Sequence, residues 1–170
     1  AQPCAGRIFV EMSTIKPETI REIARAAHEK GATLVDAPVS GTVGPARDGK
    51  LLVLTGGSAE DIRAVTPVLS LFSRRIVHLG PTGSGSSMKL ALQLPLYAYW
   101  QALGEALSLG ASEGLAVPEM LSVIADSPAA IGMLQAKIPM LLGKDNEVAF
   151  ALSAALKDLT LISDVGQGRG

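Results

Sequence analysis

A glycine-rich loop that runs straight into a long apolar helix is the feature that most constrains this chain. Residues 80–93 read Gly-Pro-Thr-Gly-Ser-Gly-Ser-Ser-Met-Lys-Leu-Ala-Leu-Gln, and between residues 86 and 112 the charged residues are Lys89 and Glu105. An ammonium group among apolar neighbours costs desolvation free energy unless it pairs with an anion or loses its proton. Lys89 is therefore the leading candidate for a chemical role.

The helix that carries Lys89 is unusually long. At 1.5 Å per residue, residues 86–113 would span roughly 40 Å, a length suited to joining two domains. Its polar residues fall on one stripe and the rest is apolar, so we expect burial on most sides and a stripe lining a cleft or a subunit contact. Pro95 removes one backbone donor and predicts a kink. The stripe consists of Ser86, Lys89, Gln93, Tyr97, Gln101, Glu105, Ser108 and Ser112.

The first half of the chain alternates apolar runs with helical patterns. Such alternation predicts parallel strands joined by right-handed crossovers, as in an open α/β sheet. Between two of the strands, residues 36–45 are so rich in Gly and Pro that we expect irregular structure. The predicted strands are 8–12, 33–37, 51–55 and 76–79, and the predicted helices start at Pro17 and span residues 59–71.

After Gly83 the pattern is helical only. Residues 118–125, 131–142 and 152–165 are further predicted helices, expected to form a small all-α bundle. The fold class is thus α/β plus all-α: part of a Rossmann-type sheet in a domain of residues 1–83, then a helical domain of residues 84–170, with the long helix between the domains.

Charge and cysteine content narrow the class of protein. The formal net charge is −1, with acidic and basic residues mixed, so no basic stripe is available for nucleic acid or an anionic membrane, and a small-molecule ligand is favoured. The single Cys4 and the absence of a signal peptide or a membrane-length apolar run favour the cytoplasm. His28 and His78 have no second metal ligand nearby in sequence, so we expect no metal site.

Four short motifs occur in an order and spacing typical of one protein family. They are residues 12–17 (Met-Ser-Thr-Ile-Lys-Pro), 36–41 (Asp-Ala-Pro-Val-Ser-Gly), the Gly83 loop leading to Lys89, and 157–159 (Lys-Asp-Leu). Over nearly the whole chain they resemble the β-hydroxyacid dehydrogenases, which include 3-hydroxyisobutyrate dehydrogenase, tartronate semialdehyde reductase and, more distantly, 6-phosphogluconate dehydrogenase.

The resemblance implies a cofactor, NAD or NADP, and a small hydroxy acid or semialdehyde as substrate. In the family an N-terminal Rossmann portion carrying G-x-G-x-x-G precedes the region corresponding to Ile8. The chain is expected to be a fragment without that phosphate-binding part, and inactive alone. The family also implies a homodimer formed through the helical domain.

The resemblance also implies roles for particular residues. Lys89 would be the general acid and base, with its pKa brought towards neutrality by burial. Gln93 shares its helix face and would hold the substrate. The implied substrate loop is Ser40, Gly41 and Thr42, and the residues implied near the nicotinamide are Ser13, Thr14 and Lys157.

Four positions depart from the family pattern. Gln93 stands where Asn is usual and adds a methylene, which would alter the grip on the substrate. The other departures are Leu92 in place of a second Asn, Thr42 in place of a glycine, and Glu11 where Asp is commoner.

Alternative interpretations stay open. Lys89 would simply reach solvent if it were an ordinary helix lysine, and Lys157 with Asp158 would be a solvated pair. Imine reductases share the implied architecture, although they often replace the lysine. A non-catalytic binding or scaffold module with a decayed site, or a stand-alone helical dimerisation module, are further alternatives.

Overall fold

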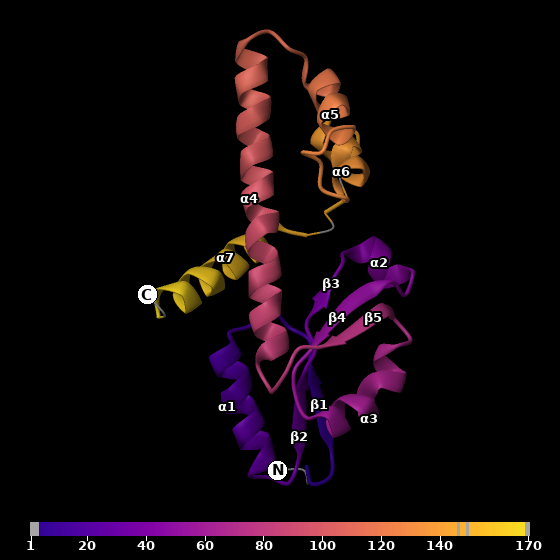
Figure 1. The fold of residues 1–170 in the computed structure, drawn as a ribbon, viewed down its shortest axis with the longest axis vertical. Coiled ribbons are helices and arrows are strands. Elements are labelled where there is room, and N and C mark those ends of the chain that lie inside the picture. Colours follow the sequence, from indigo (N-terminus) through magenta and orange to yellow (C-terminus); the bar gives the residue numbers. More distant parts are fainter. Residues whose placement is uncertain (1–3, 146, 149, 169–170) are drawn as a thin grey trace. The chain divides into compact units, whose positions relative to one another are not determined.

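The computed structural model describes residues 4–145, 147–148 and 150–168 (Figure 1). They gather into two compact units, one of residues 4–94 with 150–168 and one of residues 95–148. In chain order the elements are β1 (Ile8–Glu11), α1 (Pro17–His28), β2 (Thr33–Asp36), β3 (Val39–Ser40), α2 (Val43–Arg47), β4 (Leu51–Thr55), α3 (Ala59–Leu69), β5 (Ser73–His78), α4 (Ser84–Ser112), α5 (Val117–Ala125), α6 (Leu134–Leu141) and α7 (Leu152–Gln167).

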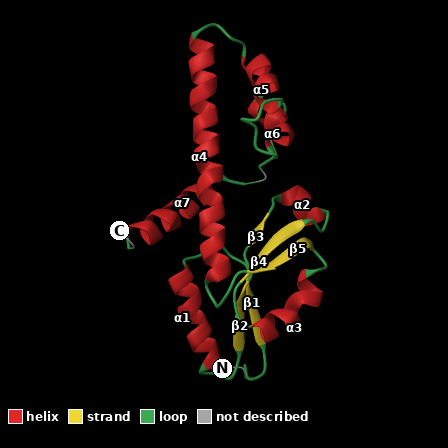
Figure 2. Ribbon diagram, viewed as in Figure 1, coloured by secondary structure: helices red, strands yellow, loops and turns green. Residues whose placement is uncertain are grey.

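The first unit has a two-stranded sheet, β1–β2, and a three-stranded sheet in the order β3–β4–β5. β1 and β2 are parallel, with Ile8 opposite Thr33, and α1 connects them. β4 and β5 are also parallel, and α3 connects them. Figure 2 shows both helices flanking the strands. The predicted parallel strand–helix–strand pairs are confirmed.

The segment predicted to be irregular is more ordered than expected, because it holds β3 and α2. β2 pairs in parallel with β1, whereas β3, three residues later, pairs antiparallel with β4. At the bend between them, Asp36 and Gly56 exchange two backbone hydrogen bonds of 3.1 and 2.9 Å, and the Pro38 carbonyl accepts one of 2.9 Å from Leu54. The expectation was wrong because β4, distant in sequence, supplies these hydrogen bonds.

Local sequence signals place the helices of this unit. Pro17 occupies the first turn of α1, where its missing N–H is not needed. The Ser58 side chain accepts a hydrogen bond of 3.0 Å from the Asp61 amide and so caps α3. One face of α3 then packs on the strands in a core made of Val35, Ala37, Val53, Ile62, Val65 and Leu69.

α4 continues through Pro95 without a break in its 29 residues. The expected burial on most sides is wrong, because Leu94 is 53% exposed and Leu109 is 68% exposed. The predicted polar stripe divides along the helix: Ser86 and Gln93 are buried, whereas Gln101 and Glu105 are exposed and bond to each other at 2.8 Å. The kink at Pro95 stays a prediction. Among the described residues, none of the helices combines the length and apolarity needed to cross a membrane.

The second unit has its own core. Leu103 of α4, Leu121 of α5 and Leu134 of α6 are buried against one another. α7 was expected in the same bundle but lies in the first unit, where hydrogen bonds tie it to α4 and to the segment after β1. The division into domains of residues 1–83 and 84–170 stays a prediction. The compact units have different bounds, at residues 94 and 150.

Candidate active site

Lys89 lies in the second turn of α4 and is half-buried. Burial lowers the pKa of the Lys89 ammonium. The nearby carboxylate of Asp158 opposes this by raising the Lys89 pKa, and the positive charge of Lys157 lowers it further. No hydrogen bond or ion pair joins the Lys89 ammonium to any residue that the structure describes. The result is an amine that gives up its proton more readily than an ordinary lysine.

α7 brings a buried carboxylate to Lys89. Asp158 is 2% exposed, accepts a hydrogen bond of 2.5 Å from Gln93 Nε2 and pairs with Lys157 Nζ at 2.7 Å. Lys157 Nζ also donates to the Thr14 carbonyl at 2.7 Å. Lys89, Gln93 and Lys157, singled out separately in the sequence, therefore all interact with Asp158, and Thr14 is linked to them through Lys157.

The Gln93 side chain is buried and forms a hydrogen bond within the protein. It is 5% exposed, and its amide nitrogen bonds to Asp158 across 65 residues of sequence. The extra methylene relative to Asn thus belongs to a side chain that reaches α7. A contact between Gln93 and substrate stays a prediction.

Ser13 lies beside this group. Its backbone N–H donates to Glu11 Oε1 at 2.8 Å, and hydrogen bonding by Ser13 lowers the pKa of the Glu11 carboxyl. The Ser13 residue is exposed, and Thr14 is half-buried beneath the Lys157 contact. The turn after β1 and the middle of α7 are consequently tied together.

The predicted substrate loop contains a glycine in a backbone conformation that other residues rarely adopt. Gly41 has φ of +132°, and a Cβ there would press on the Leu51 and Pro45 side chains, so glycine is required. Ser40 ends β3 and Thr42 precedes α2. Among the described residues, these three form no hydrogen bond or ion pair with the Lys89 group.

The first turn of α4 is held by Asp36, the first residue of the Asp-Ala-Pro-Val-Ser-Gly motif. The Asp36 side chain is fully buried, with Oδ1 accepting from the Gly83 amide at 2.9 Å and Oδ2 from the Ser86 amide at 2.8 Å. Such bonds satisfy amides that a helix leaves unpaired at its start. Asp36 therefore fixes the start of the helix that carries Lys89.

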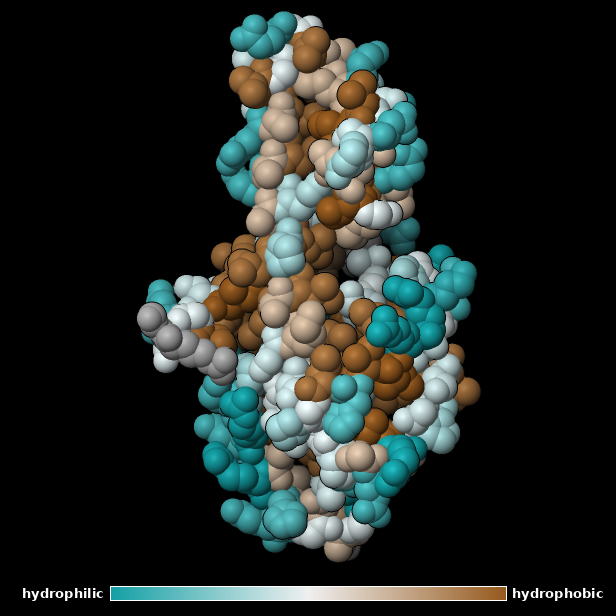
Figure 3. All heavy atoms as spheres, viewed as in Figure 1, coloured by the Kyte–Doolittle hydropathy of each residue, from teal (hydrophilic) through white to brown (hydrophobic). Residues whose placement is uncertain are grey.

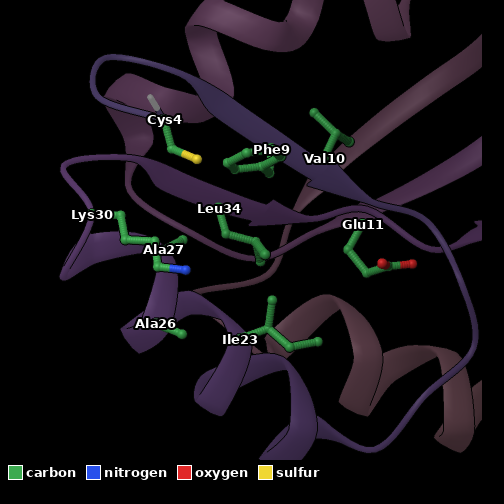
Figure 4. Close-up of a pocket in the computed structure, with 9 residues that line it drawn as sticks. All are labelled: Cys4, Phe9, Val10, Glu11, Ile23, Ala26, Ala27, Lys30 and Leu34. Atoms are coloured by element: carbon green, nitrogen blue, oxygen red, sulfur yellow. The ribbon is translucent and has the colours of Figure 1, made fainter. Parts of the chain in front are cut away.

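A groove elsewhere does not contain these groups. It has a volume of about 320 Å³ and lies between α1 and the strands β1 and β2, as the labelled side chains in Figure 4 show. Phe9, Ile23 and Leu34 give it an apolar lining, and of the predicted site residues none lines it. Within the described residues, no group of three acidic, His or Cys side chains is placed to hold a metal ion.

Sequence reasoning missed Asp158 and Asp36. The sequence assigns no role to Asp158 beyond the alternative of a solvated pair with Lys157, although its place in the Lys-Asp-Leu motif is the available signal. For Asp36, the signal was an acid at a strand end before a glycine-rich helix start, a type of residue that often caps helices. Neither pairing follows from local spacing, because the partners lie 47 to 65 residues away.

Comparison with known families divides the chain in two. Residues 1–80 match a family described as the NAD binding domain of 6-phosphogluconate dehydrogenase. Residues 83–170 match one described as NAD-binding of NADP-dependent 3-hydroxyisobutyrate dehydrogenase. The two matches meet close to the domain division predicted near Gly83.

Individual proteins agree with these matches. The chain is 35% identical over 164 residues to 2-(hydroxymethyl)glutarate dehydrogenase of Eubacterium barkeri, covering 96% of this chain and 54% of that protein. It is 44% identical over 121 residues to 3-hydroxyisobutyrate dehydrogenase of Pseudomonas aeruginosa, covering 71% and 40%. The structure of Mycobacterium tuberculosis 3-hydroxyisobutyrate dehydrogenase with L-serine superposes with a TM-score of 0.84 at 27% identity, covering 100% of this chain and 61% of that one. The chain thus spans about half the length of the curated relatives it matches.

Proposed function

The chain belongs to the β-hydroxyacid dehydrogenase family, whose cofactor is NAD or NADP, and on that premise we propose that it carries the acid–base site of such an enzyme. The reaction would interconvert a small β-hydroxy acid and its semialdehyde or keto form. The observation that carries the proposal is the half-buried Lys89 ammonium, whose pKa is lowered and which lies beside the buried Asp158.

Lys89 would move the proton of the reacting oxygen. In oxidation, the neutral amine takes the proton of the substrate hydroxyl, and in reduction the ammonium returns a proton to the same oxygen. Both directions need appreciable amounts of amine and ammonium near the working pH, which burial of Lys89 favours. Asp158 keeps the ammonium form accessible by opposing the effect of burial.

The residues near the turn after β1 fit the nicotinamide end of the cofactor. Lys157 Nζ donates to the Thr14 carbonyl, and Ser13 precedes Thr14 in the chain, which supports assigning these three residues to one cofactor contact. Bound there, the cofactor would supply hydride transfer. This chain's part would be to orient that end through Ser13 and Thr14 and to place the positive charge of Lys157 beside it.

The loop of Ser40, Gly41 and Thr42 would bind the substrate carboxylate. Gly41 allows a close backbone approach, and hydroxyls stand on both sides of it. The presence of L-serine in the Mycobacterium tuberculosis relative supports a small carboxylic acid of this size. Gln93 would contribute from the α4 side.

A homodimer is part of the proposal. Apolar side chains gather over α7 and the neighbouring part of α4, which Figure 3 shows as brown surface. An exposed apolar patch of this kind favours a protein contact, and the cytoplasm stays the expected location. The exposed apolar residues of α4 and of residues 150–167 in the first unit include Leu94, Phe150, Leu152, Leu156 and Leu159.

The test compares two proteins: the full product of the gene and chain 1–170 alone. We expect the former to reduce small semialdehydes with NADH or NADPH, and the latter to be inactive because no G-x-G-x-x-G sequence is present in these 170 residues. Turnover by chain 1–170 alone would refute the second expectation. Reduction of cyclic imines rather than semialdehydes would instead favour an imine reductase, and no turnover of any of these substrates would favour a scaffold.

Lys89→Met in the active protein tests the assignment of the proton-transfer group. We expect kcat to fall about 10²- to 10⁴-fold, the usual contribution of general acid–base catalysis. Lys137→Met, at a half-buried lysine of α6, is the matched control and should leave kcat unchanged. Equal kcat in Lys89→Met and the parent would remove Lys89 from the mechanism.

A further inference from the structure

We propose that Asp36 is a positioning residue that fixes Lys89 in place by locking the first turn of α4 onto the bend between β2 and β3. It deepens the proposed function, since it rests on the role given there to Lys89. Asp36 itself touches neither Lys89 nor, in this assignment, substrate or cofactor.

The first support is the set of bonds that meet at this residue. Its two carboxylate oxygens accept from the amides of Gly83 and Ser86, and its backbone N–H and carbonyl bond to Gly56. The side chain is fully buried. One residue thus joins the end of β2, the turn after β4 and the start of α4.

The second support is the fit around the carboxylate. A Cβ on Gly56 would collide with Asp36 Oδ1, and a Cβ on Gly85 would lie 2.9 Å from Asp36 Oδ2 and collide with the Leu54 carbonyl. The carboxylate is therefore enclosed by backbone on two sides. There is no room for the longer side chain of Glu, so the distance between the helix start and the strands is set by Asp.

The third support is that Asp36 is close, along the chain or through one hydrogen bond, to both Lys89 and the predicted substrate loop. Ser86, which donates to Asp36, is one helical turn before Lys89, and Ser40 follows Asp36 by four residues. Among charged groups, Asp158 and Lys157 act on the Lys89 pKa and Asp36 does not. Asp36 would consequently influence Lys89 through the place of the helix and not through its charge.

The experiment uses chain 1–170 and needs neither cofactor nor turnover. Asp36→Asn keeps the size of the side chain but turns an N–H donor towards one of the two backbone donors. Ser58→Ala is the matched control, because it removes the side-chain cap of α3, a helix in the same unit that does not carry Lys89. Hydrogen exchange reports on the capped amides, and competitive labelling of amines as a function of pH reports the pKa of each lysine.

We expect exchange of the Gly83 and Ser86 amides to become about tenfold faster in Asp36→Asn, in line with the loss of an N-cap. The pKa of Lys89 should rise towards its ordinary value, because a loosened first turn lets water reach the ammonium. In Ser58→Ala the Asp61 amide should exchange faster, and the pKa of Lys89 should not change. A merely structural role for Asp36 would give the same lysine result for both variants.

The proposal is overturned if the two amides of Asp36→Asn exchange faster and the pKa of Lys89 stays that of the parent. If Asp36→Asn does not fold, the same labelling and exchange measurements are made on the parent chain at urea concentrations below its unfolding transition. Labelling of Lys89 that increases while the Gly83 and Ser86 amides stay protected would overturn the proposal, and a joint increase before global unfolding would support it. Because these readouts involve no reaction, their failure is distinct from that of the kcat test on Lys89→Met.

Discussion

Replacing Asp158 by Asn removes one charge from the centre of the candidate site and leaves its shape intact. Asp158 is buried, bonds to Gln93 Nε2 and pairs with Lys157. It also raises the pKa of Lys89 against the larger effect of burial. We therefore expect Asp158→Asn to destabilise the first unit and to lower the pKa of Lys89 further.

The size of the destabilisation follows from the two contacts. Lys157 is 53% exposed, so water screens its pair with Asp158 and the pair contributes at most about 1 kcal/mol. The bond from Gln93 to a charged acceptor contributes about 1.5–3 kcal/mol, of which the Asn oxygen keeps about half. These two contacts together should lower the free energy of unfolding by about 1–2.5 kcal/mol, and any contribution from Lys89 adds to this amount.

Urea denaturation gives the stability, and competitive labelling gives the pKa of Lys89. Asp164→Asn is the control, because Asp164 lies on the same helix and pairs with Lys16 at 2.6 Å with both side chains over a third exposed. Its loss should stay below about 1 kcal/mol, with the Lys89 pKa unchanged. Equal losses in the two variants, or an unchanged or higher Lys89 pKa in Asp158→Asn, would refute the reasoning.

The lowered pKa of Lys89 also determines whether stability rises or falls with pH. Since the folded pKa of Lys89 is lowered, the unfolded chain binds more protons between the folded and the unfolded value, and the stability due to Lys89 rises with pH in that window. In Asp158→Asn the window opens at a lower pH. The part of the stability loss that arises from Lys89 should therefore vanish once the pH exceeds the ordinary lysine value.

Three further predictions concern single side chains. Gly85→Ala should cost about 2–3 kcal/mol of unfolding free energy, since its Cβ meets backbone oxygen, whereas Gly104→Ala, with open space, should stabilise α4 by about 0.5–1 kcal/mol in thermal melts. Leu121→Ala should cost about 2–4 kcal/mol in the second unit, against under about 0.5 kcal/mol for the exposed Leu109→Ala, measured by urea denaturation. The pKa of Glu11 is lowered, so its contribution to stability should be lost as pH falls through its folded value; Glu11→Gln should abolish that part of an acid titration, and an identical acid limb would contradict this.

Local pattern sufficed for much of the fold. The alternation of apolar runs and helical segments predicted the parallel pairs β1–β2 and β4–β5, and the helix predicted from residue 59 begins there as α3. Hydrophobic period also predicted the long helix α4 and the presence of α7. These features depend on residues close in sequence, for which period and capping chemistry are sufficient.

Features that depend on distant partners were not predictable in this way. β3 exists because β4 offers hydrogen bonds, so a segment rich in Gly and Pro becomes ordered. α7 belongs to the first unit and not to the predicted helical bundle, because Asp158 accepts a hydrogen bond from Gln93 and Lys157 donates one to the Thr14 carbonyl. The periodicity of α7 showed that it has an apolar side but could not say which neighbour would cover it.

The contact between Lys157 and Thr14 joins residues 143 positions apart in the chain. During synthesis, α7 leaves the ribosome after every other element described here, so the strands and α4 exist for some time without it. Over that interval Lys89 lacks both charges of α7 that act on its pKa, those of Asp158 and Lys157. The arrival of α7 is the step that completes the site, so a nascent chain interrupted before residue 152 would carry the lysine but not its electrostatic partner.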